Sequence, residues 1–222
     1  MRVITLARPP VNAIDLSLVE SLTEHLVEAE AATGCRALVL TGAGRAFSAG
    51  VDTLVVPAYD EALRERMGLA INRMVHALYG LAKPTVAAVN GHALGGGLVL
   101  ALACDFRVGA DGDYHLGLLE VTAGIPFPAV PMIVVKSELG PRVARRLALG
   151  GERISPKDPL ASEILDMVIP APRLLEAAVE RAVALADLPG YAAVKRQFKD
   201  QTLGEIGAAL DSVEAFVNMA RS

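Results

Sequence analysis

Two glycine-bearing segments, each preceded by a short apolar run, constrain this chain more than any other feature. The first run, residues 38–41 (Leu-Val-Leu-Thr), leads through Gly42 to residues 46–52 (Ala-Phe-Ser-Ala-Gly-Val-Asp). The second run, residues 85–89, leads through Asn90 and Gly91 to a glycine triplet at 95–97. Apolar runs bounded by glycine are typical of strands buried on both faces of a sheet. We therefore expect two buried strands ending in turns with free backbone N–H groups, which together can hold an oxyanion.

The rest of the chain alternates between strand and helix patterns. Apolar residues at helical spacing predict helices over 16–31 and 60–78, and short strands are expected at 106–108, 114–116 and 167–169. Three prolines, at 126, 128 and 131, predict an extended loop. From residue 172 onward the pattern is helical only. These patterns predict an α/β fold with a core over residues 1–170 and a C-terminal helical region over residues 171–222.

Composition narrows the classes of partner. With 222 residues and 53% hydrophobic side chains, the chain can bury one sizeable core. Its net charge of -4 argues against nucleic acid as the main partner. The two cysteines, Cys35 and Cys104, lie in apolar runs, which predicts reduced thiols and a cytoplasmic protein. No His, Cys, Asp or Glu grouping has the spacing of a metal site, so no metal is expected.

One stretch is long enough to raise the question of a membrane span. Residues 84–104 contain no charged side chain. However, Asn90, His92 and several glycines lie in its middle, where unsatisfied polar groups would be costly in lipid. A buried strand, a turn and a buried helix explain this stretch better. We therefore expect no membrane partner.

The glycines also have simpler explanations when each loop is considered alone. Gly42 and Gly44 begin a dinucleotide-binding pattern, but Phe47 occupies the position of its third glycine. The second loop lacks the Gly-Lys-Ser/Thr ending of a phosphate-binding loop. Close packing of a strand against a helix remains the structural alternative for either loop. The pair is more specific, because the triplet opens an apolar helix whose first N–H groups favour an anion.

Longer motifs resemble one family. Residues 46–52, residues 83–97 and the pair Cys104–Asp105 look like the enoyl-CoA hydratase/isomerase (crotonase) family, with further similarity at residues 8–13 and 117–121. The resemblance implies a spiral of repeated ββα units and a core that binds an acyl-CoA thioester. Coenzyme A is then part of the substrate, and no separate cofactor is expected. It also implies a homotrimer or a dimer of trimers, with the C-terminal helices contributing to assembly.

The resemblance assigns roles to individual positions. The two oxyanion N–H donors map onto Val51 and Gly96. Further substrate-binding positions fall on Ala49, Gly50, Asp52, Gly95 and Gly97, although an acid at position 52 can also cap the following turn. The resemblance places Lys195 near the CoA phosphates, and a solvated helical face is the alternative for this lysine.

The acid and base positions favour one reaction. Hydratases of the family use two glutamates, and their positions here hold Val99 and Glu120. A second acid used by related dienoyl isomerases falls on Pro128. A single carboxylate suits a 1,3 proton shift, so we expect an isomerase that converts a 3-enoyl-CoA to a 2-trans-enoyl-CoA through Glu120. Hydration, other thioester chemistry of the family, and a non-catalytic acyl-CoA-binding protein remain as alternatives.

Overall fold

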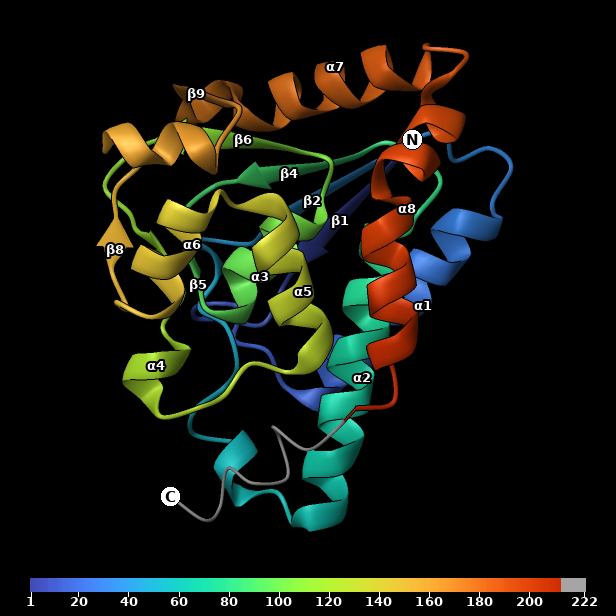
Figure 1. Cartoon of the computed structure of the whole chain (residues 1–222). Helices are drawn as coiled ribbons and strands as arrows, with labels where there is room; N and C mark the ends of the chain where they lie inside the picture. The colour runs from blue at the N-terminus through green and yellow to red at the C-terminus, as the bar shows by residue number, and fades with distance from the viewer. Residues whose placement is uncertain (213–222) are drawn as a thin grey trace.

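Two sheets organise the protein, and the computed structural model describes residues 1–212 (Figure 1). The larger sheet has the strand order β1-β2-β4-β6-β9, and its paired strands are parallel. The smaller sheet has the order β3-β5-β7-β8, in which β8 is antiparallel to β7. The strands are β1 (Arg2–Leu6), β2 (Leu38–Gly42), β3 (Ala46–Ser48), β4 (Thr85–Val89), β5 (His92–Leu94), β6 (Phe106–Asp111), β7 (Leu116–Gly117), β8 (Arg153–Ile154) and β9 (Met167–Pro170). The predicted α/β fold class is confirmed.

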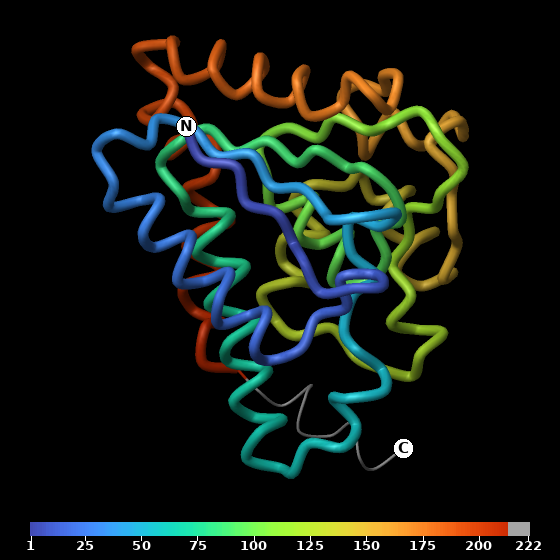
Figure 2. The backbone as a smooth tube through the Cα atoms, turned by 180° about the vertical axis from the view of Figure 1, so that it is seen from behind, coloured from blue at the N-terminus to red at the C-terminus, as the bar shows by residue number. Residues whose placement is uncertain are grey.

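Helices cover both faces of the larger sheet. Figure 1 shows α7 lying across one face, with α3 and α5 on the other side, and Figure 2 shows α1 and α2 packed side by side. The helices are α1 (Leu16–Ala31), α2 (Glu61–Tyr79), α3 (Gly96–Ala103), α4 (Glu120–Ala123), α5 (Ala129–Glu138), α6 (Pro141–Ala148), α7 (Leu174–Ala186) and α8 (Tyr191–Ala209). Short 3-10 helices occur at Val56–Ala58, Pro159–Glu163 and Ala171–Arg173.

The chain passes repeatedly from the larger sheet to the smaller one. β2 is followed by β3, β4 by β5, and β6 by β7, so each turn of the spiral adds one strand to each sheet. β3 and β5 are parallel neighbours, with Ser48 paired to Ala93. Their carboxyl ends therefore lie next to each other. This arrangement brings the segment that follows Ser48 to the glycine triplet that follows Leu94.

The C-terminal region begins where the last strand ends. β9 closes the larger sheet at Pro170, and α7 then packs against β2, β4 and β6. α8 packs against α5. The helical region predicted over 171–222 thus contains α7 and α8 and covers the core directly, while its last part, residues 213–222, lies outside the described residues. Its role in assembly stays a prediction.

The proline-rich segment differs from the expectation of an extended loop. α5 begins at Ala129, with Pro128 as its N-cap and Pro131 in its first turn. The first four N–H groups of a helix have no partner within it, so a proline there removes no helical hydrogen bond. The prediction was wrong for Pro131, because proline ends a helix but also fits its first turn.

Three further features concern the cysteines, membrane-spanning helices and metal-binding side chains. Cys35 and Cys104 are free thiols and both are buried. In the part of the chain that the structure describes, no helix combines the length and apolar character needed to cross a membrane. Likewise, residues 1–212 contain no group of three or more His, Cys, Asp or Glu side chains placed to hold a metal ion.

Candidate active site

The first backbone donor lies just after β3. The Ile14 N–H donates to the Gly50 carbonyl at 2.8 Å, and the Asp52 N–H donates to the Ile14 carbonyl at 2.9 Å. In this parallel bridge the residue between the two partners, Val51, points its own N–H to the opposite side. Within residues 1–212 the Val51 N–H has no backbone acceptor. The backbone conformation at this bend favours glycine, since Gly50 has a φ of 83°.

The second donor is the N–H of Gly96, the first residue of α3. An N–H in the first turn of a helix has no acceptor within that helix and carries part of the positive end of its dipole. A β-carbon on Gly50 would lie 3.1 Å from the Gly96 nitrogen, and one on Gly96 would lie 3.9 Å from the Val51 nitrogen. The two donors therefore face a common space, as an oxyanion hole requires.

Glu120 approaches the same space from α4, of which it is the first residue. Its Oε1 atom would be 3.2 Å from a β-carbon on Gly95, so the carboxylate lies against the backbone of the glycine triplet. Its Oε2 atom is buried and has no hydrogen-bond partner among the described residues. Burial raises the pKa of Glu120 to about 7, and the backbone N–H groups of Glu120 and Leu119 oppose this rise. A carboxyl group with such a pKa can take up and release a proton near neutral pH.

A narrow cavity of about 30 Å³ joins these three groups. Val51, Gly96 and Glu120 line it together with ten other residues, all of them apolar: Ile14, Ile71, Met74, Val75, Val99, Ile125, Pro126, Phe127, Pro128 and Pro131. Among the residues that the structure describes, Glu120 is the one titratable side chain in this lining. The cavity can thus polarise a carbonyl oxygen and move a proton beside it, in surroundings that hold little water.

Comparison with known proteins identifies the family. The family model described as enoyl-CoA hydratase/isomerase matches residues 1–214. The chain belongs to this family. A putative enoyl-CoA hydratase of Thermus thermophilus is 38% identical over 179 residues, which are 79% of this chain and 68% of that protein. A probable enoyl-CoA hydratase of Bacillus subtilis is 35% identical over 162 residues, or 71% of this chain and 61% of that protein. The chain thus spans about two thirds of the length of these relatives.

Solved structures of this enoyl-CoA hydratase/isomerase family include a named isomerase. The human mitochondrial delta3-delta2-enoyl-CoA isomerase superposes with a TM-score of 0.90 at 27% identity, covering 97% of this chain and 86% of that one. Proteins similar to this chain thus include both named hydratases and a named isomerase. Family membership alone leaves the choice between the two reactions to the residues of the site.

The structure brings together three of the positions that the family resemblance assigned. Val51, Gly96 and Glu120 line one cavity. Gly50 and Gly95 form the bends beside it, with φ values of 83° and 52°.

Two other predicted positions, Ala49 and Gly97, do not line the cavity but stabilise the loops beside it. The Ala49 N–H donates to the Val11 carbonyl at 3.0 Å, and a β-carbon on Gly97 would lie 2.2 Å from the Ser48 carbonyl oxygen. The first contact fixes the loop after β3, and the second lets α3 pack directly against β3.

Asp52 and Lys195 do not line this cavity. Asp52 Oδ1 accepts the N–H groups of Leu54 and Val55 at 3.0 Å each, which is the capping role considered from the sequence. Lys195 is buried in α8, where its Nζ lies 2.7 Å from Asp105 Oδ2 and 2.9 Å from the Lys83 carbonyl oxygen. Its ammonium is therefore already engaged within the chain and is not on a solvated helical face.

Sequence reasoning missed the apolar walls. Ile71, Met74 and Val75 of α2 and Phe127 before α5 form much of the lining. Apolar residues at helical spacing look the same whether they face a core or a ligand cavity. Only the tertiary fold distinguishes the two.

Proposed function

We propose that this protein is an acyl-CoA isomerase that shifts the double bond of a 3-enoyl-CoA to give a 2-trans-enoyl-CoA. One observation carries the proposal: among residues 1–212, Glu120 is the one titratable side chain lining the cavity. Val99 and Pro128, which the family resemblance aligns with the second acids of hydratases and dienoyl isomerases, belong to the apolar wall of the same cavity. A 1,3 proton shift needs one carboxylate, because removal and return of the proton are sequential.

The proposed reaction begins with proton removal. The Glu120 carboxylate takes a proton from C2 of the 3-enoyl thioester, and the electron pair of that bond moves onto the thioester oxygen to give a dienolate. The N–H groups of Val51 and Gly96 donate to this oxygen as its charge develops. The protonated Glu120 then delivers the proton to C4. The electron pair returns from oxygen, the double bond lies between C2 and C3, and the carboxylate is regenerated without any further cofactor.

Hydration is the second candidate, because the curated relatives named above carry hydratase names. In that reaction Glu120 alone would activate water, and Val99 could not supply the second proton transfer. The apolar lining also disfavours an ordered water beside the alkene, since a stable water needs two to four polar partners. Hydration is therefore expected to be the slower of the two reactions.

Purified protein incubated with matched 3-enoyl-CoA and 2-enoyl-CoA tests the proposal. Ultraviolet absorbance follows formation of the conjugated thioester, and mass spectrometry detects addition of water. Conjugation without a change in mass supports isomerisation, whereas a gain of water supports hydration. Glu120→Gln should abolish turnover and keep acyl-CoA affinity, and Glu152→Gln, on the surface, should leave turnover unchanged. Binding without either reaction in the wild-type protein would indicate an acyl-CoA-binding protein and overturn the proposal.

A further inference from the structure

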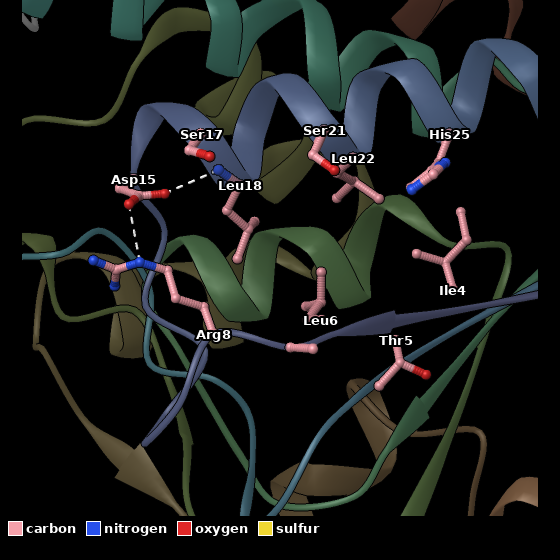
Figure 3. Close-up of a pocket in the computed structure, with 11 residues that line it drawn as sticks. Ile4, Thr5, Leu6, Arg8, Asp15, Ser17, Leu18, Ser21, Leu22 and His25 are labelled. Carbon is pink, nitrogen blue, oxygen red and sulfur yellow. Dashed lines mark hydrogen bonds and ion pairs between the residues drawn. The ribbon is translucent and has the colours of Figure 1, made fainter.

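Arg8 joins two carboxylates that belong to different loops. Its Nε lies 2.9 Å from Asp15 Oδ2, and its Nη1 lies 2.7 Å from Asp52 Oδ2. Figure 3 shows the guanidinium of Arg8 below Asp15, at the end of a surface groove between β1 and α1. Nη1 also donates to the Ala13 carbonyl at 3.3 Å. One side chain thus ties residues 13–15 to the turn that follows the first oxyanion donor.

Asp52 links Arg8 to the first oxyanion donor, the N–H of Val51. It directly follows Val51, its Oδ1 accepts the N–H groups of Leu54 and Val55, and its Oδ2 accepts from Arg8. Burial pushes the pKa of Asp52 up, but the two backbone N–H groups and the Arg8 guanidinium outweigh burial and hold the pKa below its usual value. Asp52 is therefore a charged, fully engaged anchor immediately beside Val51.

Asp15 is the second carboxylate that Arg8 binds, and it is held in place by the start of α1. Its Oδ1 accepts the Leu18 N–H at 2.9 Å, so it caps α1 while its Oδ2 faces Arg8. The preceding residue, Ile14, holds Gly50 and Asp52 through its backbone. The Ile14 side chain is 2% exposed, and its Cδ1 would be 3.2 Å from a β-carbon on Gly96. The segment between Arg8 and Asp15 thus lies behind both oxyanion donors.

We propose that Arg8 is a positioning residue of the oxyanion hole, which acts through Asp52 and Asp15 to hold the Val51 N–H in line with the Gly96 N–H. The proposal rests on the proposed function in that the bound group is an acyl thioester. Arg8 does not itself line the cavity. Its effect comes from alignment, because a displacement of about 1 Å of a catalytic group can cost ~100-fold in rate.

A purely structural ion pair predicts a different result. The Arg8 side chain is 31% exposed, but the side chains of Asp15 and Asp52 are 16% and 11% exposed, so removal of Arg8 would leave two largely buried carboxylates without their cation and destabilise the fold. If Arg8 only stabilised the fold, its removal would change the unfolding temperature and leave the bound thioester unaffected. The infrared carbonyl stretch of a bound 2-enoyl-CoA distinguishes the two roles, since hydrogen bonds to the thioester oxygen lower its frequency.

The experiment compares Arg8→Met, Arg8→Lys and the control Arg146→Met. Arg146 is a suitable control because its guanidinium also pairs with a carboxylate, that of Glu152, in a more exposed ion pair, and because it does not line the cavity. With carbonyl-labelled 2-enoyl-CoA bound, Arg8→Met should move the carbonyl stretch towards its value in free ligand. Its kcat should fall about 10-fold or more with KM nearly unchanged. Arg8→Lys, which keeps the charge, should recover part of both, and Arg146→Met should change neither.

Each other outcome bears on the proposal. An unchanged carbonyl stretch in folded Arg8→Met overturns it. If Arg8→Met does not fold, Arg8→Gln, which also removes the charge, takes its place, and an unchanged stretch in that variant overturns the proposal equally. The infrared measurement needs only binding, so a wild-type protein that binds 2-enoyl-CoA but does not isomerise would refute the proposed function and leave the role of Arg8 testable. A wild-type protein that binds no enoyl-CoA refutes both.

Discussion

Gly50 and Gly96 lie so close that no side chain fits between their backbones: a β-carbon on Gly50 would lie 3.1 Å from the Gly96 nitrogen and 2.6 Å from the Leu94 carbonyl oxygen. The contact exists because β3 and β5 are parallel neighbours whose carboxyl ends meet. Gly50 also has a φ of 83°, which L side chains rarely adopt. Space and backbone conformation therefore both require glycine at the point where the two loops form the proposed oxyanion hole.

Gly50→Ala should separate the two donors. The added methyl group must push Leu94 or Gly96 away, and loss of one oxyanion donor typically costs ~100-fold or more in rate. We expect a fall of that order in kcat, with a lowered unfolding temperature. Gly204→Ala is the control, because a β-carbon there meets nothing within 4 Å. Equal turnover in the two variants, measured by conjugation of 3-enoyl-CoA, would show that the contact does not shape the hole.

The residues with a chemical signature could be predicted from sequence. Val51, Gly96 and Glu120 are assigned by the family resemblance: the glycine motifs locate the two backbone donors, whose own side chains play no part, and the similarity at residues 117–121 locates the carboxylate. The walls could not be found in this way, since Ile71 and Met74 have the same spacing as core residues of any amphipathic helix.

The position of Lys195 could not be predicted from sequence for a related reason. Its partner, Asp105, is 90 residues away in the chain, and only tertiary packing determines which side of α8 meets it. The element boundaries show the same limit. The strands of the larger sheet at 38–42 and 85–89 were predictable from uninterrupted apolar runs, whereas the short parallel strands β3 and β5 lie in segments expected to be turns. Pro131 likewise fits either a loop or a first helical turn, and packing decides between them.

The raised pKa of Glu120 predicts how activity depends on pH. Proton removal from C2 requires the carboxylate form, and burial raises the pKa to about 7. We therefore expect kcat/KM to be low at pH 5, to rise through pH 7 and to level off above it. The measurement is the initial rate of conjugation at saturating and low 3-enoyl-CoA across this range. A rate already constant from pH 5 would contradict a buried, unpaired carboxyl group as the base.

The same pKa predicts a pH-dependent effect of Glu120→Gln on stability. The pKa of Glu120 is about 4.5 in the unfolded state and about 7 in the folded state, so the unfolded state holds fewer protons between these values. Folding stability therefore falls as pH rises through this window, by about 3 kcal/mol in total. Glutamine does not ionise. Denaturant unfolding should show Glu120→Gln gaining stability relative to wild type by roughly that amount at pH 8, and little at pH 4.

Val99→Glu should introduce the missing second acid. Val99 is 1% exposed and faces the cavity shared with Glu120. A carboxyl group at this position can donate a proton while Glu120 activates water, so we expect a water-addition product from 2-enoyl-CoA that mass spectrometry detects. Burial of the new carboxyl group should lower the unfolding temperature. Val99→Gln is the matched control, because it has the same shape without a transferable proton, and hydration by both variants would exclude this explanation.

Lys195→Met tests whether the lysine serves the fold or the CoA phosphates. Lys195 and Lys199 share Asp105 at 2.7 and 2.9 Å, and all three side chains are at most 7% exposed. Removing Lys195 leaves Asp105 paired with Lys199, so a loss of about 1–3 kcal/mol is expected, whereas Asp105→Asn leaves two buried ammonium groups together and should cost about 3–5 kcal/mol. The free energies of unfolding, measured with denaturant, should show the larger loss for Asp105→Asn.

Affinity then separates the two roles of Lys195. Its ammonium is already bound by Asp105 and by the Lys83 carbonyl, so the dissociation constant of acyl-CoA, measured by calorimetry on folded Lys195→Met, should stay within about twofold of wild type. Arg196→Met, which alters the neighbouring cation on α8, provides the comparison. A tenfold weaker affinity for Lys195→Met alone would mean that the Lys195 ammonium leaves Asp105 to meet the CoA phosphates. While it stays paired with Asp105, this buried ammonium cannot reach the ligand.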